Sequence, residues 1–358
     1  MKINSIQYLR AIAAILVVYA HSLNFIGNGN SIQANFYYLK NFGAIGVDLF
    51  FVISGFIITY VSHNLNGLKD FIVFIKKRFV RINPTYYFAS TLALILRYIS
   101  KPNIDFPFEE VIKSITILPI IDNGDKFWKP ILYVGWTLAF EWFFYLIFSL
   151  LIIVSIKRKQ LYLIIIFSIL TFFGFVFPIQ NIQYAFITNP IVWEFCMGVL
   201  IASNLSKFNI GYWTSVFIFL LGILIYFIII IYGFGINAEA NSNVYQMYYW
   251  QRFLLWGIPS AILVFGIVLI EKKIPNYFNN KLLILIGNAS FAIYLVHTLF
   301  ISLVNKFFHI FKSIPLDLVV IISVVNSVII GVIYYLVIEK RLSIFFNQIV
   351  FNKRIILK

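Results

Sequence analysis

The sequence predicts an all-α, polytopic transmembrane bundle of about ten spanning helices. Of its 358 residues, 61% are hydrophobic and only 11% are charged, whereas about 25% of the residues of a soluble domain are charged. Long apolar segments also recur along the whole chain, and most of them approach the roughly 20 residues that an α-helix needs to cross a bilayer. Together these observations exclude a soluble globular protein.

Ten segments have the length and composition of spanning helices. They are residues 6–26, 42–63, 82–100, 132–155, 160–177, 184–203, 210–232, 251–270, 282–304 and 317–339. Ten crossings place both termini on one side, and the loops and helix ends of that side hold 19 of the 28 Lys and Arg residues. Because Lys and Arg are enriched in cytoplasmic loops, both termini are expected in the cytoplasm. The same rule accounts for the net charge of +15, so no nucleic-acid partner is expected.

The chain is expected to form one transmembrane domain, residues 1–345, followed by a short basic cytoplasmic tail, residues 346–358. Between the third and fourth spans, residues 108–115 are amphipathic, which predicts a short helix at the membrane surface. The single cysteine, Cys196, lies inside an apolar run. It offers neither a disulfide framework nor a thiolate metal site, and no metal is expected.

The first span carries two ionisable residues, Arg10 and His21. Ionisable groups are costly in lipid, so each one is a hypothesis for a functional site. Eleven residues separate the two, which is roughly 16 Å along an α-helix and close to three full turns. Both side chains are therefore expected on one helix face, with the cation near one membrane surface and a titratable imidazole well inside.

Four further spans carry ionisable residues at about the depth of His21. Asp48 lies about six residues, or roughly 9 Å, below the far surface, and Glu141 lies roughly 12 Å below it among aromatic residues. A carboxylate beside a histidine fixes its tautomer. Asp48 is therefore expected either to orient the imidazole or to hydrogen-bond backbone near a helix end. Glu141 is expected either to have a polar partner at that depth or to stay protonated. His297 shares the layer, and Glu194 is a similar but weaker example.

Two arginines, Arg78 and Arg81, lie three residues apart in a cationic stretch at the expected cytoplasmic mouth. On a helix they share a face, and guanidinium groups suit bidentate recognition of phosphate. The pair is therefore expected either to hold phosphate groups or to be a plain cluster that follows the charge rule for cytoplasmic loops.

Taken in order, these residues resemble the motifs of the membrane-bound acyltransferase family 3, the bacterial O-acyltransferases of surface glycans. The similar stretches are residues 8–14 with Arg10 and His21, residues 46–56, Arg78 with Arg81, residues 136–138 with Glu141, and residues 290–297. The resemblance covers most of the chain. It implies a multi-pass enzyme of the bacterial inner membrane that takes an acyl group from acyl-CoA. The acceptor it implies is a hydroxyl of a surface polysaccharide or a lipid-linked glycan.

The resemblance also implies roles for the donor-side residues. Arg78 and Arg81 are expected to hold the phosphates of acetyl-CoA, the donor substrate, and Arg10 is expected to guide its charged head. The acyl arm would extend up the bundle towards His21. A succinyl donor is the alternative within the same class.

His21 is expected to act as general base on the acceptor hydroxyl or to carry the acyl group itself. Asp48 or Glu141 would orient the imidazole and stabilise its charged form, and His297 would line the acceptor side. A base is needed because a sugar hydroxyl is a poor nucleophile at neutral pH, and imidazole titrates near that pH.

Two other classes of membrane protein share intramembrane charges. One is a transporter or flippase for a lipid-linked sugar, and the other is a structural or sensory subunit whose charges pair helices. Only an enzyme would cleave the acetyl-CoA thioester. The sequence does not distinguish among lipopolysaccharide O-antigen, capsule, peptidoglycan and a small glycoside as the acceptor. It also does not determine whether the protein forms a homo-oligomer.

Overall fold

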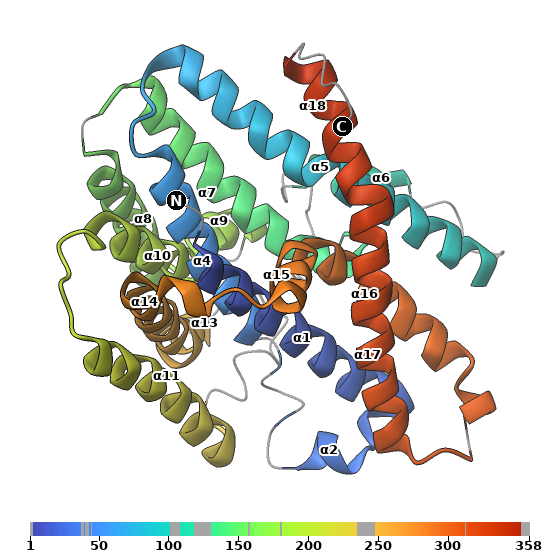
Figure 1. The fold of residues 1–358 in the computed structure, drawn as a ribbon. Coiled ribbons are helices and arrows are strands. Elements are labelled where there is room, and N and C mark those ends of the chain that lie inside the picture. Colours follow the sequence, from blue (N-terminus) through green and yellow to red (C-terminus); the bar gives the residue numbers. More distant parts are fainter. Residues whose placement is uncertain are drawn as a thin grey trace.

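A computed structural model describes residues 3–36, 39, 43, 45–100, 108–117, 130–156, 158–179, 181–234, 248–311 and 313–351. Throughout these ranges the fold is built from helices, and no strand is present (Figure 1). This confirms the predicted all-α bundle. The helices wrap around α1 (Asn4–Phe25), which contacts elements from both halves of the chain.

Eight stretches of the described chain are long and apolar enough to cross a membrane. They are α1, α4 (Ile45–Ser62), η2 (Tyr133–Gly135) with α7 (Trp136–Ile153), α8 (Lys159–Val176), α9 (Ile182–Ile187) with α10 (Val192–Asn204), α11 (Tyr212–Tyr232), α13 (Tyr248–Arg252) with η3 (Phe253–Gly257) and α14 (Ile258–Lys273), and α17 (Leu316–Tyr334) with η6 (Tyr335–Glu339) and α18 (Lys340–Phe351). A ninth results if α15 (Lys281–Asn288) and α16 (Ser290–Lys306), which meet at 68°, form one span.

The third predicted span, residues 82–100, is the second half of α5 (Gly67–Ser100). It is helical as predicted, yet α5 is not among the helices apolar enough to cross a membrane. Asn83, Pro84 and Arg97 interrupt its apolar sequence. The structure therefore gives eight or nine candidate spans in its described part, where the sequence predicts ten.

Two segments outside the predicted spans are also helical: the amphipathic stretch between the third and fourth predicted spans, and the first part of the predicted tail. The amphipathic stretch forms α6 (Phe108–Thr116), and Glu110 of that helix pairs with Arg97 of α5 at 2.5 Å. At the C-terminal end, the long α17–η6–α18 unit runs along one edge of the molecule (Figure 1). It continues to Phe351, so residues 346–351 of the predicted tail extend the helix, and residues 352–358 lie outside the described residues.

The start of α1 is fixed to the end of α14. The carboxylate of Glu271 accepts hydrogen bonds from the backbone N–H groups of Asn4 and Ser5, at 2.8 and 2.9 Å. The first N–H groups of a helix have no partner within it, and the helix dipole favours a negative charge there. Glu271 therefore anchors the helix that carries Arg10 and His21.

Helices α4 and α10 touch backbone to backbone. A Cβ atom on Gly55 would collide with the carbonyl of Phe195, and one on Gly198 would collide with the carbonyl of Val52. Small residues permit this close approach between spanning helices. The contact holds the segment that carries Asp48 and Ser54 in a fixed position against the rest of the bundle.

Candidate active site

Two histidines from different helices face each other. Nε2 of His297, on α16, lies 3.3 Å from Nδ1 of His21, on α1, and the ring centroids are 5.0 Å apart. His297 is fully buried, whereas His21 is half-buried. The two histidines that the sequence places at one depth are therefore in direct contact.

The hydrogen bonds of this pair define the tautomer of each neutral ring. Nδ1 of His21 lies 3.0 Å from the carbonyl oxygen of Val17, and Nδ1 of His297 lies 3.0 Å from that of Ile293. Only a protonated nitrogen donates to a carbonyl, so both rings carry hydrogen on Nδ1, an assignment made from the network. The single Nδ1–H of His21 is then shared between two acceptors, the carbonyl oxygen of Val17 at 3.0 Å and Nε2 of His297 at 3.3 Å. This leaves the lone pair of His21 on Nε2, the form in which an imidazole acts as a general base.

Aromatic rings stand beside His21. Phe25 stacks on the imidazole with ring centroids 5.8 Å apart and planes 7° apart, and Tyr133 presents an edge contact at 6.4 Å. Phe25 is 49% exposed and Tyr133 is 46% exposed. The imidazole thus lies at an open edge of the bundle between two exposed rings.

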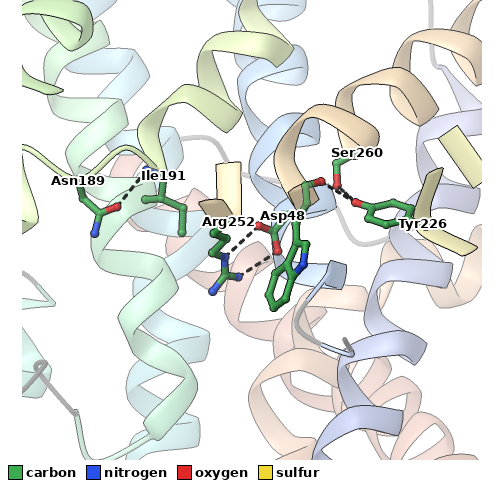
Figure 2. A network of polar contacts seen from close by, with 7 residues as sticks. Asp48, Asn189, Ile191, Tyr226, Arg252 and Ser260 are labelled. Carbon is green, nitrogen blue, oxygen red and sulfur yellow. Dashed lines mark hydrogen bonds and ion pairs between the residues drawn. The ribbon is translucent and has the colours of Figure 1, made fainter. Parts of the chain in front are cut away.

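Asp48 bonds to Arg252, and none of the described contacts joins it to His21. The guanidinium donates from Nε and Nη2 to the two carboxylate oxygens at 2.9 and 3.0 Å (Figure 2). Both side chains are buried, and the guanidinium lies over the rings of Trp136 and Trp256. The expectation that Asp48 orients the imidazole is therefore not met by its contacts: the pair instead joins α4 to the α13–α14 unit.

Glu141 also lies away from the histidines. Its carboxylate accepts hydrogen bonds from the hydroxyl of Ser54, at 3.2 Å, and from the hydroxyl of Tyr145. The guanidinium of Arg78 lies over the rings of Tyr145 and Phe74, at 5.7 and 5.4 Å. Glu141 thus has polar partners at its depth, as expected, but they belong to the arginine side of the molecule.

A cavity between α1, α4, α5, α7 and α16 brings the predicted donor-side residues together. Its volume is about 640 Å³ when the open space at its mouth is included. Its polar lining comprises Arg10, Arg81, Ser54, Glu141, Thr137, Ser290 and Tyr294. Arg81 is exposed and Arg10 is buried, so the cavity extends from a cationic, accessible end into the bundle.

The inner end of this cavity is bounded by Tyr294. Its hydroxyl bonds to the hydroxyl of Thr137 at 2.9 Å and to the carbonyl of Val134 at 3.1 Å. Its ring lies 5.9 Å from the ring of His297, one helical turn further along α16. The histidine pair therefore lies directly behind Tyr294, and neither histidine lines the cavity itself.

Three residues at or near the candidate site are absent from the sequence prediction. Arg252 is the second residue of the predicted eighth span, whereas Asp48 lies about six residues below the far surface, so counting residues along each span does not pair the two charges. Glu339 lies close enough to Arg10 and Arg81 to interact electrostatically with both, and its position at the end of the last predicted span was a signal. Tyr294 is one of 22 tyrosines, and nothing local separates it from tyrosines at the membrane surface.

Within the described residues, no group of three or more His, Cys, Asp or Glu side chains is arranged to hold a metal ion. The polar groups of the site are therefore the histidine pair, the arginines of the cavity with Glu141, and the buried Asp48–Arg252 ion pair.

Comparisons with known proteins agree with one another. A family described as acyltransferase domain matches residues 3–336. The exopolysaccharide production protein ExoZ of Rhizobium meliloti (strain 1021) is 28% identical over 276 residues, which cover 74% of this chain and 78% of that protein. The O-acetyltransferase OatA of Staphylococcus aureus (strain NCTC 8325 / PS 47) is 25% identical over 294 residues, which cover 74% of this chain but only 47% of that protein. No solved structure matches the chain.

Proposed function

Because the chain belongs to the acyltransferase domain family over residues 3–336, we propose that this membrane O-acyltransferase carries an acyl group from cytoplasmic acyl-CoA to a saccharide hydroxyl. The family and the enzyme class predicted from the ordered motifs are confirmed. We propose in addition the identity of the donor and the acceptor, the roles of the site residues, and a location in the bacterial inner membrane.

One arrangement supports this proposal more than any other. Helix α1 carries Arg10 at the donor cavity and His21 at the histidine pair, and α16 carries Tyr294 and His297 in the same order. The two residues of α1 are roughly 16 Å apart along the helix axis. A cationic site for phosphate and a base are thus separated along the bundle, and the flexible arm of CoA can join them.

The donor side suits the charge of acyl-CoA. Arg10 and Arg81 line the cavity, and Arg78 lies beside it over Tyr145. Guanidinium groups bind phosphate oxygens through paired N–H groups. Acetyl-CoA is therefore the proposed donor, with its phosphates at the arginines and its thioester towards Tyr294.

The transfer step assigns a proton to His21. Nε2 takes the proton of the acceptor hydroxyl while the hydroxyl oxygen attacks the thioester carbon. The new C–O ester bond forms, the C–S bond breaks, and the proton passes from His21 to the leaving thiolate. If Nε2 attacks the thioester first, the C–S bond breaks, the CoA thiolate leaves and the acyl group rests on Nε2 of His21. The acceptor hydroxyl then displaces it, the N–acyl bond breaks, and the hydroxyl proton passes to the thiolate.

His297 has the role that the sequence analysis gives to a carboxylate. Its Nε2 accepts from the Nδ1–H of His21, which holds the imidazole in one tautomer and supports the positive charge that develops on it. Either transfer route places that charge on the same ring.

The acceptor side suits a sugar. Phe25 and Tyr133 present exposed aromatic rings next to His21, and such rings cover the apolar face of a sugar and exclude water from it. The names of the relatives refer to exopolysaccharide production and O-acetyl transfer. A surface polysaccharide, such as capsule or lipopolysaccharide, or its lipid-linked precursor, is the proposed acceptor.

Purified protein in proteoliposomes tests the proposal. We expect it to release free CoA thiol from acetyl-CoA and to add one acetyl mass to glycan taken from cells that lack the gene. A protein that leaves acetyl-CoA intact while it moves a lipid-linked sugar across the membrane would be a flippase, and one that does neither would be a structural subunit.

A further inference from the structure

The donor cavity and the histidine pair form two compartments on one helix. Ser290 and Tyr294 line the cavity, and His297 follows on the same helix, α16, outside it. The ring of Tyr294 lies between them, 5.9 Å from the ring of His297 and 6.1 Å from the ring of Phe50, another residue of the cavity wall. An acyl group that enters from the arginines therefore meets Tyr294 before it reaches His21.

The ring of Tyr294 is held in place from α7. Its hydroxyl bonds to a side-chain hydroxyl, that of Thr137, and to a backbone carbonyl, that of Val134. Tyr294 is only 6% exposed. A buried tyrosine with both bonds satisfied has a defined ring position, so it presents a fixed wall to whatever occupies the cavity.

We propose that Tyr294 is the residue that restricts this enzyme to short acyl groups, because its anchored ring stands between the donor cavity and the histidine pair. The inference rests on the proposed function, since it assumes an acyl-CoA in the cavity. The acyl group passes the ring to reach Nε2 of His21, and each added methylene has to be accommodated beside the contact between the rings of Tyr294 and Phe50. The substrate class is thus a short, unbranched acyl-CoA.

The wall near Tyr294 also disfavours a charged acyl group. Inside the cavity, the ring of Phe50 and the hydroxyl of Thr137 contact Tyr294, whereas Arg81, the exposed cation of the cavity, belongs to its accessible end. A succinyl group would bring its free carboxylate to this apolar and hydroxyl-lined end, where an unpaired charge is costly. Acetyl and propionyl groups have no such charge.

Replacement of Tyr294 leaves its partners satisfied. The Thr137 hydroxyl lies 3.0 Å from the Val134 carbonyl and donates to it in Tyr294→Leu and Tyr294→Phe, where the Tyr294 hydroxyl no longer competes for that carbonyl. Leu shortens the wall, and Phe keeps the ring but removes both anchors. Tyr226 provides a matched control, because its buried hydroxyl bonds to the carbonyl of Trp256 and the hydroxyl of Ser260 outside the cavity.

The experiment measures kcat/KM for release of CoA thiol from acetyl-, butyryl-, hexanoyl- and succinyl-CoA, using full-length protein in proteoliposomes. One methylene in an apolar pocket changes discrimination by about 10-fold to 200-fold. We expect Tyr294→Leu to reduce the acetyl-to-hexanoyl ratio by at least about 10-fold, Tyr294→Phe to reduce it by less, and Tyr226→Leu and Tyr226→Phe to leave it unchanged. Thermal unfolding in the same detergent identifies any variant that has lost its fold.

An acetyl-to-hexanoyl ratio that stays at the wild-type value in folded Tyr294→Leu, or in Tyr294→Phe if the Leu variant does not fold, overturns the inference. An equal loss of activity with all four donors also overturns it, since that result would make Tyr294 necessary for transfer rather than selective. Failure of the proposed function is a different result, because wild-type protein would then release no thiol from any donor.

Discussion

Nε2 of His297 lies 3.3 Å from Nδ1 of His21, and both Nδ1 atoms lie 3.0 Å from carbonyl oxygens of their own helices. The relationship joins residues 276 positions apart. It gives His21 a second histidine as the partner that orients it. It also leaves Nε2 of His21 as the nitrogen able to accept a proton.

The first prediction concerns that partner. His297→Ala removes one of the two acceptors that share the Nδ1–H of His21, so we expect kcat to fall by about 100-fold, the lower end of the range of general-base effects. KM for acetyl-CoA should stay near the wild-type value, because His297 lies outside the donor cavity. His297→Gln restores an acceptor and should recover part of kcat. The exposed His63 gives the control, His63→Ala, and an equal loss there would contradict the assignment.

The second prediction separates two roles for Asp48. Removing one partner of a buried ion pair destabilises a protein by about 3–5 kcal/mol, so Asp48→Ala should lower the unfolding temperature sharply. The double variant Asp48→Leu with Arg252→Met should recover most of that stability, as buried pairs often tolerate apolar replacement. Thermal unfolding of the two single variants and the double variant measures the coupling. If Asp48→Asn abolished transfer without lowering stability, Asp48 would act on the chemistry instead.

The third prediction concerns the cationic end of the cavity. Arg81→Ala should raise KM for acetyl-CoA about 10-fold to 100-fold, because a charge-assisted hydrogen bond contributes about 1.5–3 kcal/mol. Lys76→Ala removes a cation of the same exposed stretch of α5 that does not line the cavity, and its KM should change little. An equal rise in both variants would mean that general charge attraction, not the cavity arginine, binds the donor.

The fourth prediction concerns the acceptor side. Phe25→Ala and Tyr133→Ala should lower the rate of glycan acetylation about 2-fold to 10-fold each, the effect of losing about 0.5–1.5 kcal/mol of aromatic contact. Hydrolysis of acetyl-CoA without glycan should change much less. Tyr98, 65% exposed on α5, supplies the control Tyr98→Ala. Loss of glycan acetylation in that variant as well would assign the effect to membrane anchoring.

The sequence predicts how deep an ionisable side chain lies in the bilayer, but it does not predict which way that side chain points around its helix axis. Counting residues along each span placed His21 and His297 in one layer, and they are in contact. The same count placed Asp48 there too, but it cannot show which way a side chain points around the helix axis. Asp48 faces Arg252. The residue count therefore predicts a layer of ionisable groups but does not identify which of them contact one another.

Two further features of the structure, the bend in the ninth predicted span and the position of Tyr294, were not predicted from the sequence. The apolar run 282–304 contains a 68° bend between α15 and α16, which hydropathy does not register, because apolar residues occupy both sides of it. Tyr294 acquires its position from that bend and from Thr137, a residue 157 positions away. Neither the bend nor this contact has a signature in a single sequence.

The most direct test of the central claim is turnover by His21→Ala in proteoliposomes, measured as acetyl mass added to glycan. The account predicts that kcat falls by at least about 100-fold, while the unfolding temperature and KM for acetyl-CoA stay near the wild-type values. A folded His21→Ala protein that acetylates glycan at the wild-type rate would contradict the account, because His21 would then be neither base nor acyl carrier.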